Sequence, residues 1–310
     1  MTTTKWFIII NPTAGGGKGG KYWSDIKELL SKTGVNFDFA VSEYSQHVIE
    51  LTKKAIKEGY RKIIAVGGDG TINEVINGMF QQKIVTPSEL SFANIPVGTG
   101  NDWIKTHGIP SNYKKAILSL KSGHSMAHDV GEVSYYDKNG EQKRRYFMNV
   151  AGLAYDAFVT KASQEGSRWM GTKMFYYYLI LRCVTQYTAT RAKITFDGQE
   201  VESIFYNIAV GICKHNAGGA QFVPHAIPDD GLFALAYFTD IKGIDVLLNS
   251  RKFYDGSIIH HPKCFTTQAK HIKIEAAEDS PNFVEVDGEF LGKTPIEFIM
   301  HQQAINVIVP

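Results

Sequence analysis

Residues 63–74 read IIAVGGDGTINE, an apolar run followed by a glycine-rich turn and the start of a helical pattern. The run Ile63–Val66 is short enough for a buried strand, and the spacing over 71–80 predicts a helix. Between them, residues 67–70 form a turn whose backbone N–H groups suit phosphate oxygens, and Asp69 is a candidate Mg²⁺ ligand. The stretch therefore predicts a strand, an anion-binding turn and a helix in direct succession.

Part of this stretch also has a purely structural explanation. Thr71 and Glu74 have the spacing of a capping box, in which two side chains bond backbone N–H groups at the start of a helix. Such a box needs no ligand. It does not account for Gly67, Gly68 or Asp69, so the turn itself remains a candidate phosphate site.

The alternation of strand and helix extends over the first 120 residues. Short runs predict strands at 6–10, 35–41, 63–66 and 92–95, and helical spacing occurs at about 21–32, 45–59, 71–80 and 113–121. Strands and helices that alternate at this spacing form parallel βαβ units. We therefore expect an α/β nucleotide-binding domain, a parallel sheet with flanking helices.

Two more glycine-rich turns follow strands of this sheet, NPTAGGGKGG at 11–20 and PVGTGND at 96–102. The first is not a P-loop, because Pro12 stands where that motif needs a glycine six residues before Lys18. Each turn alone could be a flexible loop or an Asx turn. Ligands of open parallel sheets bind outside the carboxyl ends of the strands, so three such turns together favour a nucleotide phosphate site.

The pattern changes near Asp129, after which most segments are strands joined by turn dipeptides. Asn139-Gly140 and Asp197-Gly198 are typical hairpin turns. Strands are expected at 146–150, 204–210, 232–238, 271–275, 283–286 and 304–309, with helices at about 172–185 and 244–254. We therefore place a nucleotide-binding domain at 1–128 and a second, β-rich domain at 129–294.

Composition limits the class of protein. The 310 residues are 44% hydrophobic and 21% charged, which is ordinary globular usage with room for two domains. A net charge of +2 gives no case for nucleic-acid binding. Three cysteines far apart favour a reducing, cytoplasmic setting over a disulfide framework. The longest apolar run, 174–181, is far shorter than the roughly 20 residues of a spanning helix.

Six motifs carry a resemblance to a known family. They are NPxxGGGK at 11–18, GGDGT at 67–71, PxGTxND at 96–102, GLAYDA at 152–157, PDDG at 228–231 and DGE at 287–289. In order and rough spacing the sequence resembles the diacylglycerol kinase catalytic-domain superfamily, and within it the soluble bacterial lipid kinases related to diacylglycerol and sphingosine kinases. GGDGT is shared with NAD kinases and phosphofructokinases, whereas PxGTxND singles out the lipid kinases.

The resemblance implies a fold and a nucleotide site. The family has an N-terminal nucleotide domain and a C-terminal β-sandwich with the lipid between them, and its chain end returns to the first domain, so residues 295–310 are expected to complete it. The family's ATP contacts fall on these residues: Asn11, Ser42, Gly67, Gly68, Asp69, Gly70, Thr71, Ile72, Asn73 and Thr99.

The resemblance also implies catalytic and metal-binding residues. Glu289 matches the family's proposed general base, Asp287 supports it, and Asp69 completes the catalytic set. A structural Mg²⁺ falls on the carboxylate of Asp230 and the main-chain oxygens of Ile227 and Leu232. Without the resemblance, residues 286–289 would be interpreted as a hairpin turn and residues 229–231 as an exposed turn.

These implications predict an ATP- and Mg²⁺-dependent lipid kinase whose leading reaction converts diacylglycerol into phosphatidic acid. It would meet its lipid at the membrane surface, as a cytoplasmic protein peripheral to the inner face without a transmembrane segment, and a homodimer is allowed. Two alternatives stay open. One is a NAD kinase, which shares the GGDGT turn, and the other is a nucleotide- or lipid-binding regulator without turnover.

Three further features of the sequence are weaker indications of function. His124 and His128 have the i, i+4 spacing of a zinc pair on a helix, but Gly123 and the onset of a strand argue against that helix. Residues 143–145 are interpreted as a solvated strand end that could touch anionic headgroups. The aromatic stretch 168–182 is either a core helix or one that lines the lipid site or rests at the membrane interface.

Overall fold

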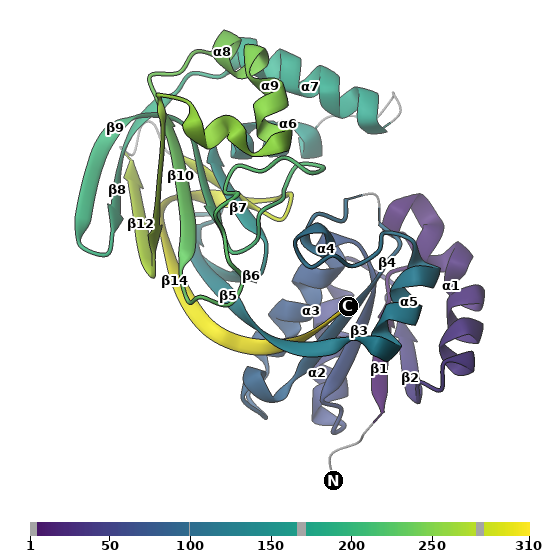
Figure 1. Cartoon of the computed structure of the whole chain (residues 1–310). Helices are drawn as coiled ribbons and strands as arrows, with labels where there is room; N and C mark the ends of the chain where they lie inside the picture. Colours follow the sequence, from purple (N-terminus) through teal and green to yellow (C-terminus); the bar gives the residue numbers. More distant parts are fainter. Residues whose placement is uncertain (1–4, 99, 166–171, 277–281) are drawn as a thin grey trace.

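A computed structural model describes residues 5–98, 100–165, 172–276 and 282–310. It has two parts (Figure 1): a sheet covered by helices, and a second body of long strands with several helices at its far end. Thr99 and the start of the aromatic stretch at 168–182 lie outside the described residues. Within these ranges, no helix has the length and apolarity needed to cross a bilayer.

The first part is the expected alternation of strands and helices. Its elements are β1 (Trp6–Ile10), α1 (Ala14–Lys32), β2 (Phe37–Val41), α2 (His47–Lys57), β3 (Lys62–Gly67), α3 (Asp69–Gln81), η1 (Pro87–Glu89), β4 (Ser91–Pro96), α4 (Trp103–Thr106) and α5 (Tyr113–Ser122). Strands β2, β1, β3 and β4 pair in parallel in that order. β1, β3 and β4 are largely buried and therefore read as apolar runs.

The second part is mainly antiparallel. Its elements are β5 (His124–Tyr136), β6 (Gln142–Phe147), β7 (Val150–Ala154), α6 (Tyr155–Glu165), α7 (Thr172–Gln186), β8 (Thr190–Phe196), β9 (Gln199–Gly211), β10 (Phe233–Thr239), α8 (Gly243–Leu248), α9 (Ser250–Asp255), η2 (Ser257–His260), β11 (Cys264–Ala269), β12 (His271–Ala276), β13 (Phe283–Val286) and β14 (Glu289–Val309). Pairings run from β9 through β7, β13, β14, β12 and β8 back to β9, which closes the strands around an apolar core.

Two long strands, β5 and β14, run through both parts (Figure 1). Asn306 and Val307 of β14 pair in parallel with Ser91 and Phe92 of β4, and Val307 lies in the core of the first part. The parallel strands are thus continuous with antiparallel ones, and the sheet as a whole is mixed rather than purely parallel. The domain boundaries at 128 and 294 stay predictions.

Several elements differ from the sequence expectation. The segment α1 includes residues from Ala14, but Gly15, Gly16 and Gly17 have left-handed backbone angles, so the regular helix begins only after them. The helix expected at 244–254 is two helices, interrupted at Asn249. Helix α6 was not expected, and the strand at 304–309 is the end of β14. The capping box at Thr71 was wrong, because α3 already begins at Asp69.

Candidate functional site

The second and third glycine-rich turns pack directly against each other. Gly67 is in register with Pro96, so both turns leave the same edge of the sheet. A Cβ placed on Gly68 would lie 2.7 Å from Gly100 O, and one on Gly98 would lie 2.6 Å from Gly68 Cα. Contacts this short exclude a side chain. At these two positions glycine is required by the close approach of the two backbones.

Substituting Gly68→Ala is therefore expected to destabilise the protein by about 1–3 kcal/mol, since the added methyl group forces the two turns apart. Gly68 has φ −111°, so the cost comes from contact rather than from backbone strain. Urea unfolding measures the change. Gly20→Ala is the control, because its Cβ would meet Pro12 O at an ordinary 3.4 Å. Equal unfolding midpoints for the two variants would contradict the packing argument.

The first turn contacts the second through Asn11 and the third through Gly15. Asn11 Nδ2 donates to Thr71 Oγ1 at 3.1 Å, and Asn11 Oδ1 accepts from the backbone N–H of Thr13 at 3.1 Å. Ser42 is buried at the end of β2, and its N–H donates to Ile10 O at 2.8 Å. A Cβ on Gly15 would lie 2.1 Å from Val97 O in the third turn. The structure thus brings Asn11, Ser42 and Thr71 to one edge.

Asp69 connects the second turn to α4. Its carboxylate accepts the backbone N–H groups of Asp102, at 2.8 Å, and Trp103, at 3.2 Å. Burial raises the pKa of Asp69 to about 6, although these two donors oppose the shift. Asp102 in turn pairs with Lys105 at 2.6 Å and accepts the N–H of Gly218 at 2.7 Å. This chain of contacts ties the turns to the second part of the protein.

Asp287 reaches the first part from the turn between β13 and β14. Both Asp287 and Gly288 have positive φ, so the hairpin interpretation is confirmed. The same turn places Asp287 Oδ2 2.8 Å from Asn73 Nδ2, which donates to it. Asp287 Oδ1 is buried without a protein partner. Burial raises the pKa of Asp287 to about 7, and the nearby Asp69 adds to the shift.

Glu289 follows in the same turn and stands next to the second glycine-rich turn. A Cβ placed on Gly70 would lie 3.9 Å from Glu289 Oε1. Glu289 Oε2 accepts from Arg145 Nη2 at 2.8 Å. The Glu289 side chain is 41% exposed, whereas the Arg145 side chain is only 10% exposed. The prediction that residues 143–145 form a solvated strand end is therefore wrong for Arg145. Its contact with Glu289 could not be predicted, because the two residues are far apart in the sequence.

The acidic groups near Asn73 fit a hard divalent cation. Mg²⁺ takes oxygen ligands, and Asp287 Oδ1 is a buried carboxylate oxygen without a partner. Each Asp69 oxygen accepts one backbone donor and keeps a further lone pair. At the second expected Mg²⁺ position, both carboxylate oxygens of Asp230 already accept a hydrogen bond, from Leu232 N at 2.9 Å and from Gln268 Nε2 at 3.0 Å. Ile227, whose main-chain oxygen is an expected ligand, is exposed. That assignment stays a prediction.

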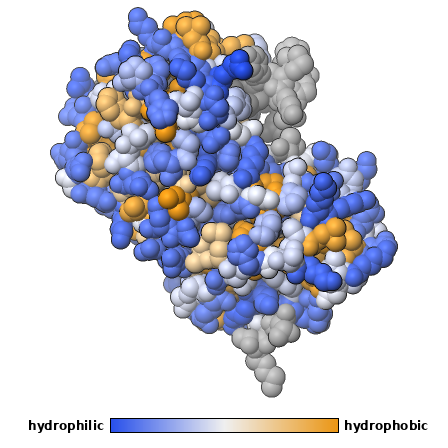
Figure 2. Space-filling model, in the orientation of Figure 1, coloured by the Kyte–Doolittle hydropathy of each residue, from blue (hydrophilic) through white to orange (hydrophobic). Residues whose placement is uncertain are grey.

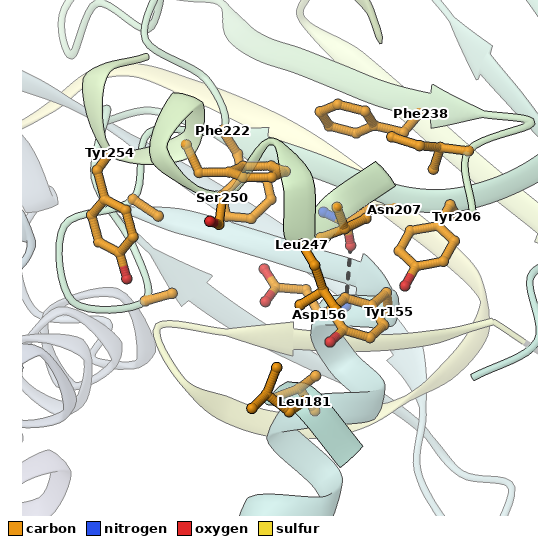
Figure 3. A pocket seen from close by; sticks show the side chains of 16 residues that line it. Tyr155, Asp156, Leu181, Tyr206, Asn207, Phe222, Phe238, Leu247, Ser250 and Tyr254 are labelled. Atoms are coloured by element: carbon orange, nitrogen blue, oxygen red, sulfur yellow. Dashed lines mark hydrogen bonds between the residues drawn. The ribbon is translucent and has the colours of Figure 1, made fainter. Parts of the chain in front are cut away.

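An apolar pocket of about 270 Å³ opens in the second part, between α6, α7, α8 and α9. Aromatic side chains, among them Phe222, Phe238 and Tyr254, line it (Figure 3). One carboxylate, that of Asp156, points among them. Burial raises the pKa of Asp156 to about 6. The pocket therefore suits a largely apolar ligand with one hydrogen-bonding group.

The pocket is linked to the turn that carries Glu289. Glu285 lies buried beside Asp156, and a Cβ on Gly152 would come within 2.4 Å of Asp156 Oδ2 and 2.6 Å of Glu285 Oε1. Glu285 Oε2 accepts the N–H of Gly288 at 2.8 Å. Sequence reasoning marked Asp156 only as part of a family motif and did not single out Glu285. Their pairing depends on β7 and β13 lying side by side.

Comparisons with known proteins show the family of this chain. The family model for the diacylglycerol kinase catalytic domain matches residues 5–133, and that for the YegS C-terminal NAD kinase beta sandwich-like domain matches residues 149–309. A Staphylococcus carnosus protein named diacylglycerol kinase is 31% identical over 311 residues, covering 98% of this chain and 94% of that relative.

Solved structures give the same result for the fold. A Bacillus anthracis protein provisionally named a diacylglycerol kinase superimposes with a TM-score of 0.77 at 25% identity, covering 100% of this chain and 99% of its own. Yeast NADH kinase in complex with NADH gives a TM-score of 0.51 at 11% identity, covering 99% and 83% of the two chains, which is a likeness of fold alone.

The two-part fold and its glycine-rich turns define a kinase. With both family models matched and a relative aligned along nearly the whole chain, the protein belongs to the diacylglycerol kinase family of lipid kinases.

Proposed function

We propose that this enzyme transfers the γ-phosphate of ATP to a lipid hydroxyl, with diacylglycerol as substrate and phosphatidic acid as product. One observation carries the proposal: the turn of residues 287–289 bonds α3 through Asn73 and sets Glu289 beside Gly70. A carboxylate from the second part thus lies at the edge where the nucleotide phosphates are expected. That is the position a base needs in order to accept the proton of an attacking hydroxyl.

The individual roles follow from the contacts. We assign the phosphates to the three glycine-rich turns, with Asn11, Ser42 and Thr71 beside them. Asp69 and Asp287 would hold Mg²⁺, which when bound neutralises charge on the phosphate oxygens. Glu289 accepts the hydroxyl proton, and Arg145 fixes the direction of its carboxylate through the 2.8 Å contact.

The apolar pocket supports a lipid as the acceptor. Its volume and aromatic lining suit part of an acyl chain, and Asp156 would bond a polar group of the lipid. Contacts from Asp156 through Glu285 to Gly288 bring this polar end close to Glu289. A NAD kinase would need a polar surface for its second nucleotide, and the apolar lining disfavours that alternative.

The decisive experiment supplies purified protein with labelled ATP, Mg²⁺ and micelles that carry one candidate lipid each. The panel is diacylglycerol, monoacylglycerol, phosphatidylglycerol, a sphingoid base and ceramide, with NAD in a separate reaction. Label in diacylglycerol supports the proposal. Label in NAD alone would establish the NAD kinase alternative, and bound ATP without any labelled acceptor would favour a regulator without turnover.

Exposed apolar side chains surround the pocket and support docking on a membrane surface. Figure 2 shows hydrophobic side chains at the top of the molecule, where α8 lies in Figure 1. Leu248 is 78% exposed, Tyr254 59% and Ile244 56%, and the basic Arg251 and Lys252 are exposed beside them. Such an apolar face with basic neighbours fits the interface of an anionic bilayer.

Replacing Leu248 with glutamine is expected to weaken binding to anionic vesicles roughly 10- to 150-fold, because burying one leucine side chain contributes about 1.5–3 kcal/mol. Vesicle co-sedimentation measures the loss, and the apparent KM for the vesicle-borne lipid should rise in parallel. Leu118→Gln on α5 is the matched control, since Leu118 is 55% exposed on the other part of the molecule. Equal losses in both variants would contradict docking through α8.

A further inference from the structure

A second, buried cluster of ligating side chains shares no residue with the site described above and is linked to it through Trp103. His107 follows α4, His128 lies in β5 and Cys213 follows β9, and their ligating atoms all lie within 4.8 Å of one another. The two histidine Nε2 atoms are 3.2 Å apart, and Cys213 Sγ is 3.7 Å from each of them. The helical pair of His124 and His128 does not form, because both residues lie on a strand.

These separations are close to the distances between ligand atoms that bind the same metal ion. Zinc binds imidazole nitrogen at about 2.0–2.1 Å and thiolate sulfur at about 2.3 Å. In a tetrahedral arrangement, two such nitrogens are roughly 3.3 Å apart, and nitrogen and sulfur are roughly 3.6 Å apart. The observed separations lie close to both values, so the three ligands could close on one ion with small side-chain movements.

The hydrogen bond made by His128 Nδ1 determines which ring nitrogen of this residue can bind a metal ion. His128 Nδ1 lies 2.6 Å from the backbone oxygen of Asp129, which places the ring proton on Nδ1 and leaves the lone pair of Nε2 for a ligand. Trp103 Nε1 lies 3.3 Å from His128 Nε2 and must give up that contact when an ion binds.

We propose that His107, His128 and Cys213 bind one Zn²⁺ ion. On binding, the Cys213 thiol releases its proton to solvent, and His107 carries its own proton on Nδ1 so that Nε2 can coordinate. His107 is only partly buried and provides the side from which the ion enters. The ion ties the end of α4 to the segment after β9, the same two regions that Asp102 joins through Gly218.

Cobalt substitution tests the proposal without any activity measurement. Co²⁺ added to the intact protein is expected to give a thiolate-to-cobalt charge-transfer band at one equivalent, which Zn²⁺ abolishes. Cys213→Ser should lose the band and weaken Zn²⁺ binding by more than roughly 100-fold, beyond the cost of losing a second-shell partner. Cys264→Ser, at a partly exposed thiol elsewhere, should keep both.

Circular dichroism checks that each variant is folded. If Cys213→Ser does not fold, His107→Ala replaces it, because that side chain is partly exposed and its loss should still remove tight Zn²⁺ binding. A folded wild-type protein that gives no charge-transfer band would overturn the proposal. So would a band that persists in Cys213→Ser or disappears in Cys264→Ser. In those cases the cluster is only a hydrogen-bonded core.

Discussion

The variant Glu289→Gln is expected to phosphorylate lipid roughly 10²–10⁴ times more slowly than the wild type, the usual contribution of a general base. Glutamine keeps the size of the side chain and one contact to Arg145, but it cannot accept the hydroxyl proton. ATP binding should stay unchanged, because Glu289 lies beside the phosphate turn rather than within it. Initial rates at saturating lipid and an ATP titration separate the two effects.

Glu297→Gln provides the matched control for this prediction. Glu297 lies on the same strand, and its side chain is 41% exposed like that of Glu289, but it pairs with His271 far from the glycine-rich turns. Its kcat should equal that of the wild type. Wild-type turnover in Glu289→Gln would remove Glu289 from the mechanism and leave Asp287 as the nearest remaining carboxylate of the same turn.

The variant Asp287→Asn is expected to be more stable than the wild type at pH 8, while its turnover is lost. The pKa of Asp287 rises from 3.8 to about 7 on folding, so the folded state holds its proton more tightly than the unfolded state. Stability of the wild type therefore falls as the pH rises from about 4 to about 7. Asparagine is never ionised and avoids this loss, which is on the order of 4 kcal/mol.

The backbone also tolerates this substitution. Position 287 has φ +52° and precedes Gly288, and Asn-Gly is a preferred pair for such a hairpin turn. Urea unfolding at pH 5 and pH 8 tests the prediction, with the difference between variant and wild type largest at pH 8. Asp137→Asn is the control. Backbone donors lower the pKa of Asp137, so its replacement should cost stability at pH 8 instead. Parallel pH dependences for wild type and Asp287→Asn would refute the argument.

Much of the first part could be predicted because its signals are local. A buried parallel strand appears as a short apolar run, and a glycine turn before a helix is visible in consecutive residues. The residues from Gly67 to Asn73 are adjacent in sequence and adjacent in space. The requirement for glycine at position 68 could not be predicted, because Gly68 contacts Gly98 only when β3 and β4 pair.

The second part depends on contacts between distant residues. Arg145 and Glu289 are 144 residues apart, and His107 and Cys213 are 106 apart. No sequence motif links the members of either pair. The three basic residues at 143–145 would ordinarily be exposed to solvent. Helix α6 was missed because it follows β7 directly, without a loop. The family motifs located Asp287 and Glu289, but only the closed circuit of strands explains how they reach Asn73.

Strand β14 also limits when the first part of the chain can complete its folding during synthesis. Asn306 and Val307, which pair with β4, are synthesised long after β4 itself. Until then β4 is an open sheet edge, and Phe92 lacks the neighbours that Val307 later provides. The first part therefore completes its sheet only after the strands of the second part have been made. Removing the end of β14 would expose the edge of β4 and take Val307 out of the core of the first part, so we expect the loss to destabilise both parts of the protein.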